Sequence, residues 1–419
     1  MKKLIKRKFK SAMNYVRTFI KWLVISVVTG AVGGLVGTLF HISIDSVTEL
    51  RGENPWILFF MPIGGLIIVF LYKVTKMWDN GGTNNVINSV KEKENVPFKL
   101  APLIFISTVI THLVGGSSGR EGAALQLGGS IGAQSAKIFR QDKMNENIVI
   151  MCGMSSVFSA LFGTPITATV FAIEVISVGI MYYAGLVPCI FSALTAYVIA
   201  KYFGVTPVQF TVSGIPPLGF SAVIRIIILA ALCAVVSIIF CVSMRKTALF
   251  GKKLIKNDYL RAVCGGILVI LLTLLVGTYD YNGAGMNIVQ KAIDGKANWY
   301  DFILKIIFTA VTLAAGFKGG EIVPTFFVGA TFGCVCGSLL GLDPGFSAAL
   351  GLTTLFCGVV NCPFAAFLLA IEIFGADGII YYAMVSGIGY MLSGYYGLYS
   401  SQKIVYSKLR AEYINMDAK

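Results

Sequence analysis

The chain has 419 residues, of which 56% are hydrophobic and only 13% are charged. Soluble domains average about one quarter charged residues, so this composition excludes an ordinary soluble domain and indicates a polytopic membrane protein. The net charge of +14 would suggest nucleic-acid binding in a soluble protein, but the positive residues lie at the ends of apolar segments. The positive-inside rule explains this distribution without nucleic acid.

Apolar runs along the chain predict roughly ten or more membrane-embedded helices, since a full span needs about 20 residues. Several runs are short or interrupted by glycine and proline, so we expect some half-helices. Ten-residue units of alternating hydrophobicity are missing from the sequence, which argues against an outer-membrane barrel. The apolar runs are 19–44, 55–73, 99–115, 148–202, 219–244, 259–278, 301–316, 324–341, 346–374 and 379–393.

The distribution of lysine and arginine predicts the orientation in the membrane. The uncharged loop 203–217 is expected outside, and both termini are expected in the cytoplasm. The segments predicted to be cytoplasmic are the N-terminal tail, 73–93, 137–143, 245–261 and 403–410.

These features divide the chain into five parts. No cleavage site follows the basic N-terminus, so we expect a basic amphipathic helix there rather than a signal peptide. After the last apolar run we expect a short tail with a basic helix over 403–410, and no regulatory cytosolic domain. The expected parts are the cytoplasmic helix 1–22, a first membrane repeat 23–244, a basic cytoplasmic connector 245–261, a second membrane repeat 262–400, and a cytoplasmic tail 401–419.

A Gly-x-x-Gly-x-Glu pattern occurs twice, and its second copy starts at Gly316, 200 residues after the first copy at Gly116. Pro165 and Glu174 likewise align with Pro363 and Glu372. The chain is therefore an internal duplication. Duplicated transporter halves commonly hold the substrate between them near the bilayer midplane, where broken helices direct their N-termini at an anion. An odd number of spans in each half would make the repeats inverted.

The first copy carries Arg120 and Glu121 inside an apolar stretch, and ionisable groups in such a place indicate a functional site. The helical segment 123–138 follows, so the motif predicts a helix N-terminus that attracts negative charge. A free anion and the Glu121 carboxylate would compete for that site, and protonation of Glu121 would release it. The alternative is that Glu121 only caps the helix or pairs with Arg120.

The second copy places Glu321 at an equivalent helix start. It would act as a second protonatable group, or alternatively as a helix cap paired with Lys318. Glu174 and Glu372 are interpreted as structural residues that bind backbone groups at helix ends near the cytoplasm. Two histidines and nine scattered cysteines do not form a zinc or disulfide pattern, so no metal site and no cofactor are expected.

Four segments resemble motifs of the CLC family of anion channels and anion/proton antiporters, in the order of that family. Residues 119–122 (Gly-Arg-Glu-Gly) resemble its gating-glutamate motif, and 320–324 (Gly-Glu-Ile-Val-Pro) its G-x-F-x-P motif. Residues 397–400 resemble the segment with its central tyrosine, and 82–86 align with its G-S-G-I-P segment. The resemblance implies an all-α polytopic membrane protein and a homodimer, with a CLC-type duplicated (inverted-repeat) architecture in which broken helices meet at a midplane anion site.

The departures from the chloride-type motifs indicate the substrate. Thr83-Asn84-Asn85 without proline replaces the chloride motif, and an acid, Glu321, stands in the second repeat. Val175 stands where chloride/proton exchangers carry an inner glutamate. These features resemble the bacterial fluoride-exporting branch of the family. That resemblance implies a fluoride/proton antiporter in the inner (plasma) membrane of a bacterium, because a small, strongly hydrated anion needs hard hydrogen-bond donors.

The resemblance also implies the residues of the site and their partners. Glu121 would gate the site and transfer protons, with Glu321 as the second protonatable group. The expected partners are fluoride, protons, the lipid bilayer and a second copy of the chain. The residues expected to bind the anion are Thr83, Asn84, Asn85, Gly119, Arg120, Gly122, Ile322, Val323 and Tyr399.

Two alternatives remain. One is a chloride/proton antiporter or a chloride channel of the same fold, with chloride in place of fluoride. The other is an intramembrane enzyme or a lipid-processing protein, but the sequence has no Ser/His dyad, HExxH or paired-aspartate motif that supports it. We therefore do not expect an enzyme.

Overall fold

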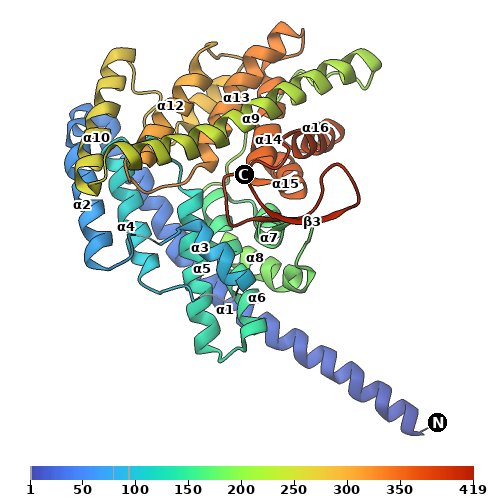
Figure 1. Ribbon diagram of the computed structural model, residues 1–419. Coiled ribbons are helices and arrows are strands. Elements are labelled where there is room, and N and C mark those ends of the chain that lie inside the picture. The colour runs from blue at the N-terminus through green and yellow to red at the C-terminus, as the bar shows by residue number, and fades with distance from the viewer. Residues whose placement is uncertain (1, 79, 93–94) are drawn as a thin grey trace.

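A computed structural model describes residues 2–78, 80–92 and 95–419, and the side chains from residue 11 onward (Figure 1). The first half contains the helices α1 (Lys2–Glu53), α2 (Met61–Val74), α3 (Thr83–Glu92), α4 (Leu100–Leu113), α5 (Glu121–Ile138), α6 (Lys143–Phe162), α7 (Pro165–Glu174) and α8 (Leu186–Tyr202). The second half contains α9 (Phe220–Leu254), α10 (Asp258–Val276), α11 (Met286–Ile293), α12 (Asp301–Ala314), α13 (Ile322–Leu339), α14 (Pro344–Val360), α15 (Pro363–Phe374) and α16 (Ile379–Leu392). The 3₁₀ helices η1 (Pro55–Phe60) and η2 (Tyr183–Gly185) and the strands β1 (Ser177–Val178), β2 (Lys403–Tyr406) and β3 (Tyr413–Asp417) complete the described elements.

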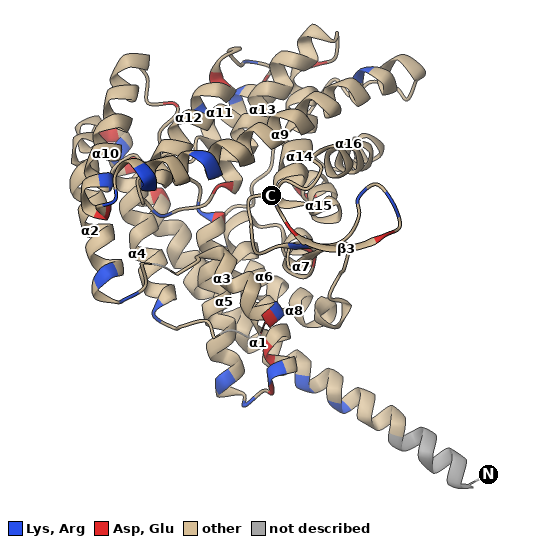
Figure 2. Cartoon of the chain, in the orientation of Figure 1, with Lys and Arg blue, Asp and Glu red and all other residues tan. Residues whose placement is uncertain are grey.

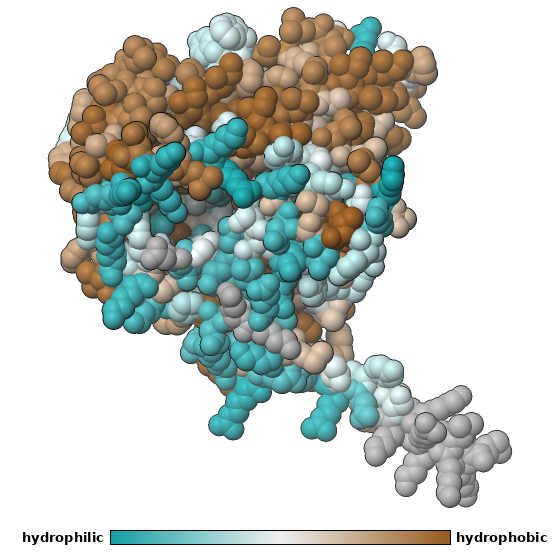
Figure 3. Space-filling view, in the orientation of Figure 1, coloured by the Kyte–Doolittle hydropathy of each residue, from teal (hydrophilic) through white to brown (hydrophobic). Residues whose placement is uncertain are grey.

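Each predicted apolar run contains helix, and the expected mixture of full spans and shorter helices is confirmed. Seven helical segments of the described chain are long and apolar enough to cross a membrane, and five further apolar helices have 10–17 residues. A broad hydrophobic band covers one part of the surface, and a hydrophilic face lies beside it (Figure 3). Lysine and arginine gather on this face (Figure 2), which we name the basic face.

Glycine lets the helices of each half approach one another closely. In the first half α5 and α6 pack at Gly128 and Gly153, and in the second half α13 and α14 pack at Gly329 and Gly351. A Cβ atom on any of these four glycines would meet the backbone of the opposite helix. Small residues at such crossings are typical of membrane helices, where close van der Waals packing holds helices together.

Four glycines of α1, Gly30, Gly33, Gly34 and Gly37, form a stripe of small residues that packs against neighbouring helices. Gly30 and Gly34 face α8, where a Cβ on Gly34 would lie 2.7 Å from the Cα of Ala196. Gly33 and Gly37 face α6. The stripe therefore places α1 in the groove between α6 and α8.

Glu174 and Glu372 hold the two halves together by capping each other's helices. The Glu372 carboxylate accepts from the Thr167 N–H at 2.7 Å in the first turn of α7, and the Glu174 carboxylate accepts from the Ala365 N–H at 2.8 Å in the first turn of α15. Their structural role is confirmed. This reciprocal contact makes α7 and α15 antiparallel and puts the two acids at opposite ends of the helix pair, and the expectation that both lie near the cytoplasm stays a prediction.

Two basic segments are more helical or more continuous than expected. One is at the start of α1, and the other spans the end of α9 and the start of α10. The N-terminal segment 1–22 is not a separate helix, since α1 continues without a break into the first span; residue 1 lies outside the described residues. The connector expected over 245–261 is almost entirely helical, because α9 ends at Leu254 and α10 begins at Asp258. Lysine, arginine and leucine are good helix formers, so positive charge alone does not mark a loop.

The C-terminal segment forms strands, and the helix expected over 403–410 is wrong. β2 pairs in parallel with β1 through Ser177 and Lys403, and β3 pairs with β2 in antiparallel fashion. Ile404 is fully buried in this small sheet. The β-branched pair Ile404-Val405 fits a pleated surface better than a helix, and β1 offers an edge with which it can pair.

The packing of α1 predicts that Gly34→Leu destabilises the fold. A side chain at this position must displace the α8 backbone, and overpacking of this kind costs about 1–3 kcal/mol. We expect thermal unfolding of the detergent-solubilised protein to shift down by several degrees. Gly52→Leu is the matched control, since a Cβ at Gly52 has no neighbour within 4 Å. Equal unfolding temperatures for the two variants would contradict this packing.

Candidate functional site

A backbone bridge joins the two halves at the residues that precede α5 and α13. The Gly119 N–H donates to the Gly320 oxygen at 2.7 Å, and the Gly320 N–H donates to the Gly119 oxygen at 2.7 Å. Two residues after each glycine a helix has begun, α5 at Glu121 and α13 at Ile322. The unpaired N–H groups of two helix N-termini therefore converge at this bridge, and such groups together with the helix dipoles form an anion site.

The Glu121 carboxylate lies at this convergence. Its Oε2 accepts from the Arg120 N–H at 3.0 Å, and the Val323 N–H at the start of α13 also faces it. The side chain is fully buried, and Oε1 has no hydrogen-bond partner among the described residues. A Cβ on Gly119 would lie 2.5 Å from Oε2, which explains the glycine. The carboxylate thus occupies the point where the N–H groups at the starts of α5 and α13 converge.

The Arg120 side chain points away from the anion position. Its guanidinium donates to Asp45 of α1 at 2.9 Å, and Asp45 also pairs with His41 at 3.0 Å. The Nε atom is 3.9 Å from Glu121 Oε1, the outer limit for an ion pair. The alternative in which Glu121 is simply neutralised by Arg120 therefore has little support, and Arg120 contributes its backbone N–H and a nearby positive charge.

Glu321 lies on the other side of the bridge. A Cβ on Gly122 would lie 3.5 Å from Glu321 Oε2, so this carboxylate is close to the first turn of α5. The arrangement is crossed, because Glu121 faces the start of α13 and Glu321 faces the start of α5. Lys318 does not form the pair with Glu321 that the alternative interpretation of Glu321 requires, because its Nζ lies 4.6 Å from the ring centre of Tyr72.

Glu321 also lines a cavity of about 1210 Å³, which we name the basic cavity. The ends of α2 and α9 and the start of α10 form its rim, and Gly397, Leu398 and Ser400 contribute to its wall. Tyr399, between these wall residues, is 2% exposed, and its hydroxyl has no partner among the described residues. The Tyr399 O–H is thus a buried donor without an acceptor among the described residues, on a residue that lies between wall residues of the basic cavity.

Thr83 is hydrogen-bonded to α5, one of the two helices that begin at the bridge. Its hydroxyl donates to the Gly122 oxygen at 3.1 Å and accepts from the Gln126 amide at 3.2 Å. Gln126 was not expected from the sequence, although it lies on the same face of α5, one turn after Gly122. Thr83 thus connects α3 to the start of α5.

The two asparagines of α3 have different surroundings. Asn84 Oδ1 accepts from the Ser401 N–H at 3.0 Å and so fixes the segment that follows Tyr399. Asn85 Oδ1 is buried without a hydrogen-bond partner in the described part of the chain. An amide oxygen accepts hydrogen bonds, so Asn85 Oδ1 as placed offers no donor to an anion.

Three further positions complete the site. Ile322 and Val323 are buried and present the backbone of the first turn of α13. Ser118 was not selected from the sequence, yet its hydroxyl is buried beside Gly319 and has no partner among the described residues. Val175 is buried as well, and its backbone oxygen accepts from the Gln402 amide at 2.9 Å. A valine side chain carries no proton at that position.

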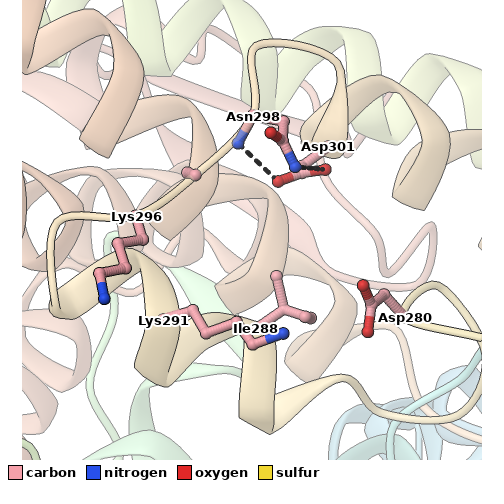
Figure 4. Close-up of a pocket in the computed structure, with 7 residues that line it drawn as sticks. Asp280, Ile288, Lys291, Lys296, Asn298 and Asp301 are labelled. Atoms are coloured by element: carbon pink, nitrogen blue, oxygen red, sulfur yellow. Dashed lines mark hydrogen bonds between the residues drawn. The ribbon is translucent and has the colours of Figure 1, made fainter. Parts of the chain in front are cut away.

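A second, smaller cavity lies at the opposite ends of α10 and α12, and has a volume of about 310 Å³. It contains Lys291 and Lys296 together with Asp280 and Asp301 (Figure 4). Asp301 is already engaged, since it accepts from the Asn298 N–H at 2.8 Å. The positive and negative charges of this cavity balance each other, and neither Glu121 nor Glu321 lines it.

Known proteins are similar to this chain in sequence and in fold. Residues 64–394 match the family described as voltage gated chloride channel. A chloride/fluoride channel protein of Pseudomonas syringae pv. tomato is 32% identical over 396 residues, which cover 93% of this chain and 87% of the relative. The H(+)/Cl(−) exchange transporter ClcA of Vibrio vulnificus is 22% identical over 408 residues, 90% of this chain and 87% of the relative.

Solved structures agree. A CLC-type fluoride/proton antiporter superposes with a TM-score of 0.88 at 29% identity, covering 91% of this chain and 98% of the other. A slow cyanobacterial Cl⁻/H⁺ antiporter, at 18% identity and a TM-score of 0.75 over 89% of this chain and 94% of the other, shows the fold alone. The duplicated halves, the crossed glutamates and these matches together establish that the chain belongs to the voltage-gated chloride channel (CLC) family.

Proposed function

We propose that the protein is a fluoride/proton antiporter that exports fluoride from the cytoplasm in exchange for protons. The observation that carries this proposal is the position of the Glu121 carboxylate, which is buried where the N–H groups of α5 and α13 converge. An anion and this carboxylate cannot occupy the same donors. Their competition couples anion binding to the protonation of one side chain.

The cycle follows from this competition. When Glu121 is ionised, its carboxylate fills the site and closes it. A proton that reaches Glu121 removes its charge, and with it the attraction to the two helix N-termini. The side chain then yields the amides to an anion. Loss of the proton to the cytoplasm restores the carboxylate, which expels the anion to the outside, so the two ions move in opposite directions.

Glu321 and Tyr399 support fluoride as the anion. Fluoride is a strong hydrogen-bond acceptor, and a phenol or a protonated carboxyl group offers the O–H donor that it needs. Glu321 lines the basic cavity and adjoins the bridge, and the hydroxyl of Tyr399, which lies between wall residues of that cavity, is buried without a partner among the described residues. The relative named a chloride/fluoride channel and the fluoride/proton antiporter of similar fold are consistent with this substrate.

Orientation and assembly belong to the same proposal. The basic face is assigned to the cytoplasm by the positive-inside rule, so the basic cavity is the inner mouth and both termini lie inside. We assign the protein to the inner membrane of a bacterium as a homodimer, with one anion pathway in each subunit.

Ion selectivity tests the substrate. In proteoliposomes loaded with either anion, we expect fluoride efflux to exceed chloride efflux by about tenfold or more, which corresponds to about 1.4 kcal/mol of discrimination. Efflux is measured with ion-selective electrodes at matched concentrations. Equal rates would favour the second candidate, a chloride/proton antiporter or channel, which the similarity to ClcA also supports.

Glu121→Gln tests the gate. The amide has the shape of the protonated acid but cannot exchange a proton, so fluoride-driven proton uptake into liposomes should fall to the background of protein-free vesicles. Glu49→Gln, an exposed acid on α1, is the matched control and should behave like the parent protein. Parental proton uptake by Glu121→Gln would show that Glu121 is not the coupling residue.

Glu321→Gln tests the second acid. Glutamine retains donors but loses the proton that the acid would exchange, so we expect slower fluoride efflux and a fluoride-to-chloride ratio reduced by about tenfold, a change of about 1.4 kcal/mol. The ratio is measured under the same conditions for the parent and the variant. An unchanged ratio would leave Glu321 as a structural residue of the α13 N-terminus.

A further inference from the structure

The basic cavity carries more positive charge than its acids can compensate. Its volume of about 1210 Å³ exceeds what a single halide ion needs. Only two of its lining residues are acidic, Asp258 and Glu321. The basic residues that line it come from α2 and its C-terminal end, from α9 and α10 and the link between them, and from the segment before α13: Lys73, Lys76, Arg245, Lys252, Lys256, Arg261 and Lys318.

Part of this charge is already paired. Asp258 binds Lys73 at 2.8 Å and Arg261 at 2.7 Å. Lys318 is placed over aromatic rings, with its Nζ 4.9 Å from the Trp78 ring centre. The remaining four basic residues form no ion pair with a carboxylate in the described part of the chain: Lys76, Arg245, Lys252 and Lys256.

One donor of Arg261, in the wall of the cavity, has no acceptor. The residue is 6% exposed, and its guanidinium is fixed by Asp258 and by the Ile255 oxygen at 3.1 Å. Its Nε atom is buried and has no hydrogen-bond partner among the described residues. A buried donor of a charged group is costly when it is unpaired. An anionic ligand with several oxygens would compensate Arg245 and the unpaired lysines together and would lie close to the charge of Arg261, because guanidinium and ammonium groups both bind phosphate.

The rim of the cavity indicates where such a ligand comes from. The last turns of α9 expose Leu249, Phe250 and Leu254 beside Lys252 and Lys253. Apolar and basic residues combined at a helix end are typical of a segment that lies in the membrane interface, where the apolar side meets acyl chains and the basic side meets headgroups. The hydrophobic band and the basic face adjoin each other on the surface (Figure 3).

We propose that the basic cavity binds the phosphate headgroup of an anionic phospholipid, whose acyl chains lie along the apolar side of the end of α9. The headgroup phosphate is held by Arg245, Lys252 and Lys256 and lies toward Arg261. A bound headgroup places negative charge at the mouth that leads to Glu321, so it reduces anion access from this side. The binding itself does not depend on which anion the protein transports.

Lipid retention tests the proposal directly. The purified full-length protein is equilibrated with an equal mixture of phosphatidylglycerol and phosphatidylcholine, and native mass spectrometry measures the lipid that remains bound. We expect the parent to retain phosphatidylglycerol preferentially. The double variant Lys252→Gln/Lys256→Gln should reduce that preference by about tenfold or more, because each basic residue near a headgroup contributes to its attraction.

The smaller cavity supplies a matched control. Lys291→Gln/Lys296→Gln removes the same charge from a cavity at the other ends of α10 and α12 (Figure 4) and should leave the preference unchanged. An equal loss in both double variants would reduce the effect to net charge and overturn the proposal. So would a parent protein that retains both lipids alike. All four lysines are on the surface of the fold, and thermal unfolding verifies that both variants remain folded.

A titration with a soluble anion distinguishes a lipid headgroup from a soluble phosphate as the ligand of the basic cavity. Inorganic pyrophosphate is titrated against the protein in phosphatidylcholine alone. If pyrophosphate binds, and binding is lost in Lys252→Gln/Lys256→Gln, while phosphatidylglycerol is not retained, the cavity takes soluble anions and the lipid proposal is wrong. Because these readouts measure binding and not flux, their failure is distinguishable from failure of fluoride transport.

Discussion

The pair of backbone hydrogen bonds between Gly119 and Gly320 is the constraint on which the rest of the structure depends. It joins the two halves head to head, so that α5 and α13 both begin at one point inside the protein. A Cβ on Gly320 would collide with the Gly122 amide, so the bridge requires glycine. The glycine in each copy of the duplicated motif is therefore required by the geometry of the bridge. This geometry produces the converging amides and places the carboxylates of Glu121 and Glu321 beside them.

Helices that begin inside a membrane protein leave polar backbone groups that must be satisfied by the protein itself. In this chain each half satisfies the other. Glu372 caps α7 of the first half, Glu174 caps α15 of the second half, and the glycine bridge completes the arrangement at the site. A single half would leave these backbone groups unpaired, so the fold needs both halves. At the bridge, by contrast, the N–H groups that begin α5 and α13 face the Glu121 carboxylate, and we propose that an anion can take its place.

The sequence predicted the apolar helices, the duplication and the acids of the site, because each depends on local pattern or on a repeat. It could not predict partners that are distant in the chain. Asn84 binds the Ser401 N–H, 317 residues away, and no local pattern distinguishes it from Asn85. The C-terminal strands were missed because β2 depends on a two-residue edge at β1. Ser118 became visible only through its burial beside Gly319.

The central claim is that Glu121 and the anion compete for the same backbone donors. Equilibrium binding of fluoride, measured by titration calorimetry across a range of pH, tests it most directly. The account predicts that fluoride binds the parent protein more tightly as pH falls, since protonation frees the site, and that Glu121→Gln binds fluoride with an affinity that no longer follows this dependence. The same pH dependence in both proteins would contradict it.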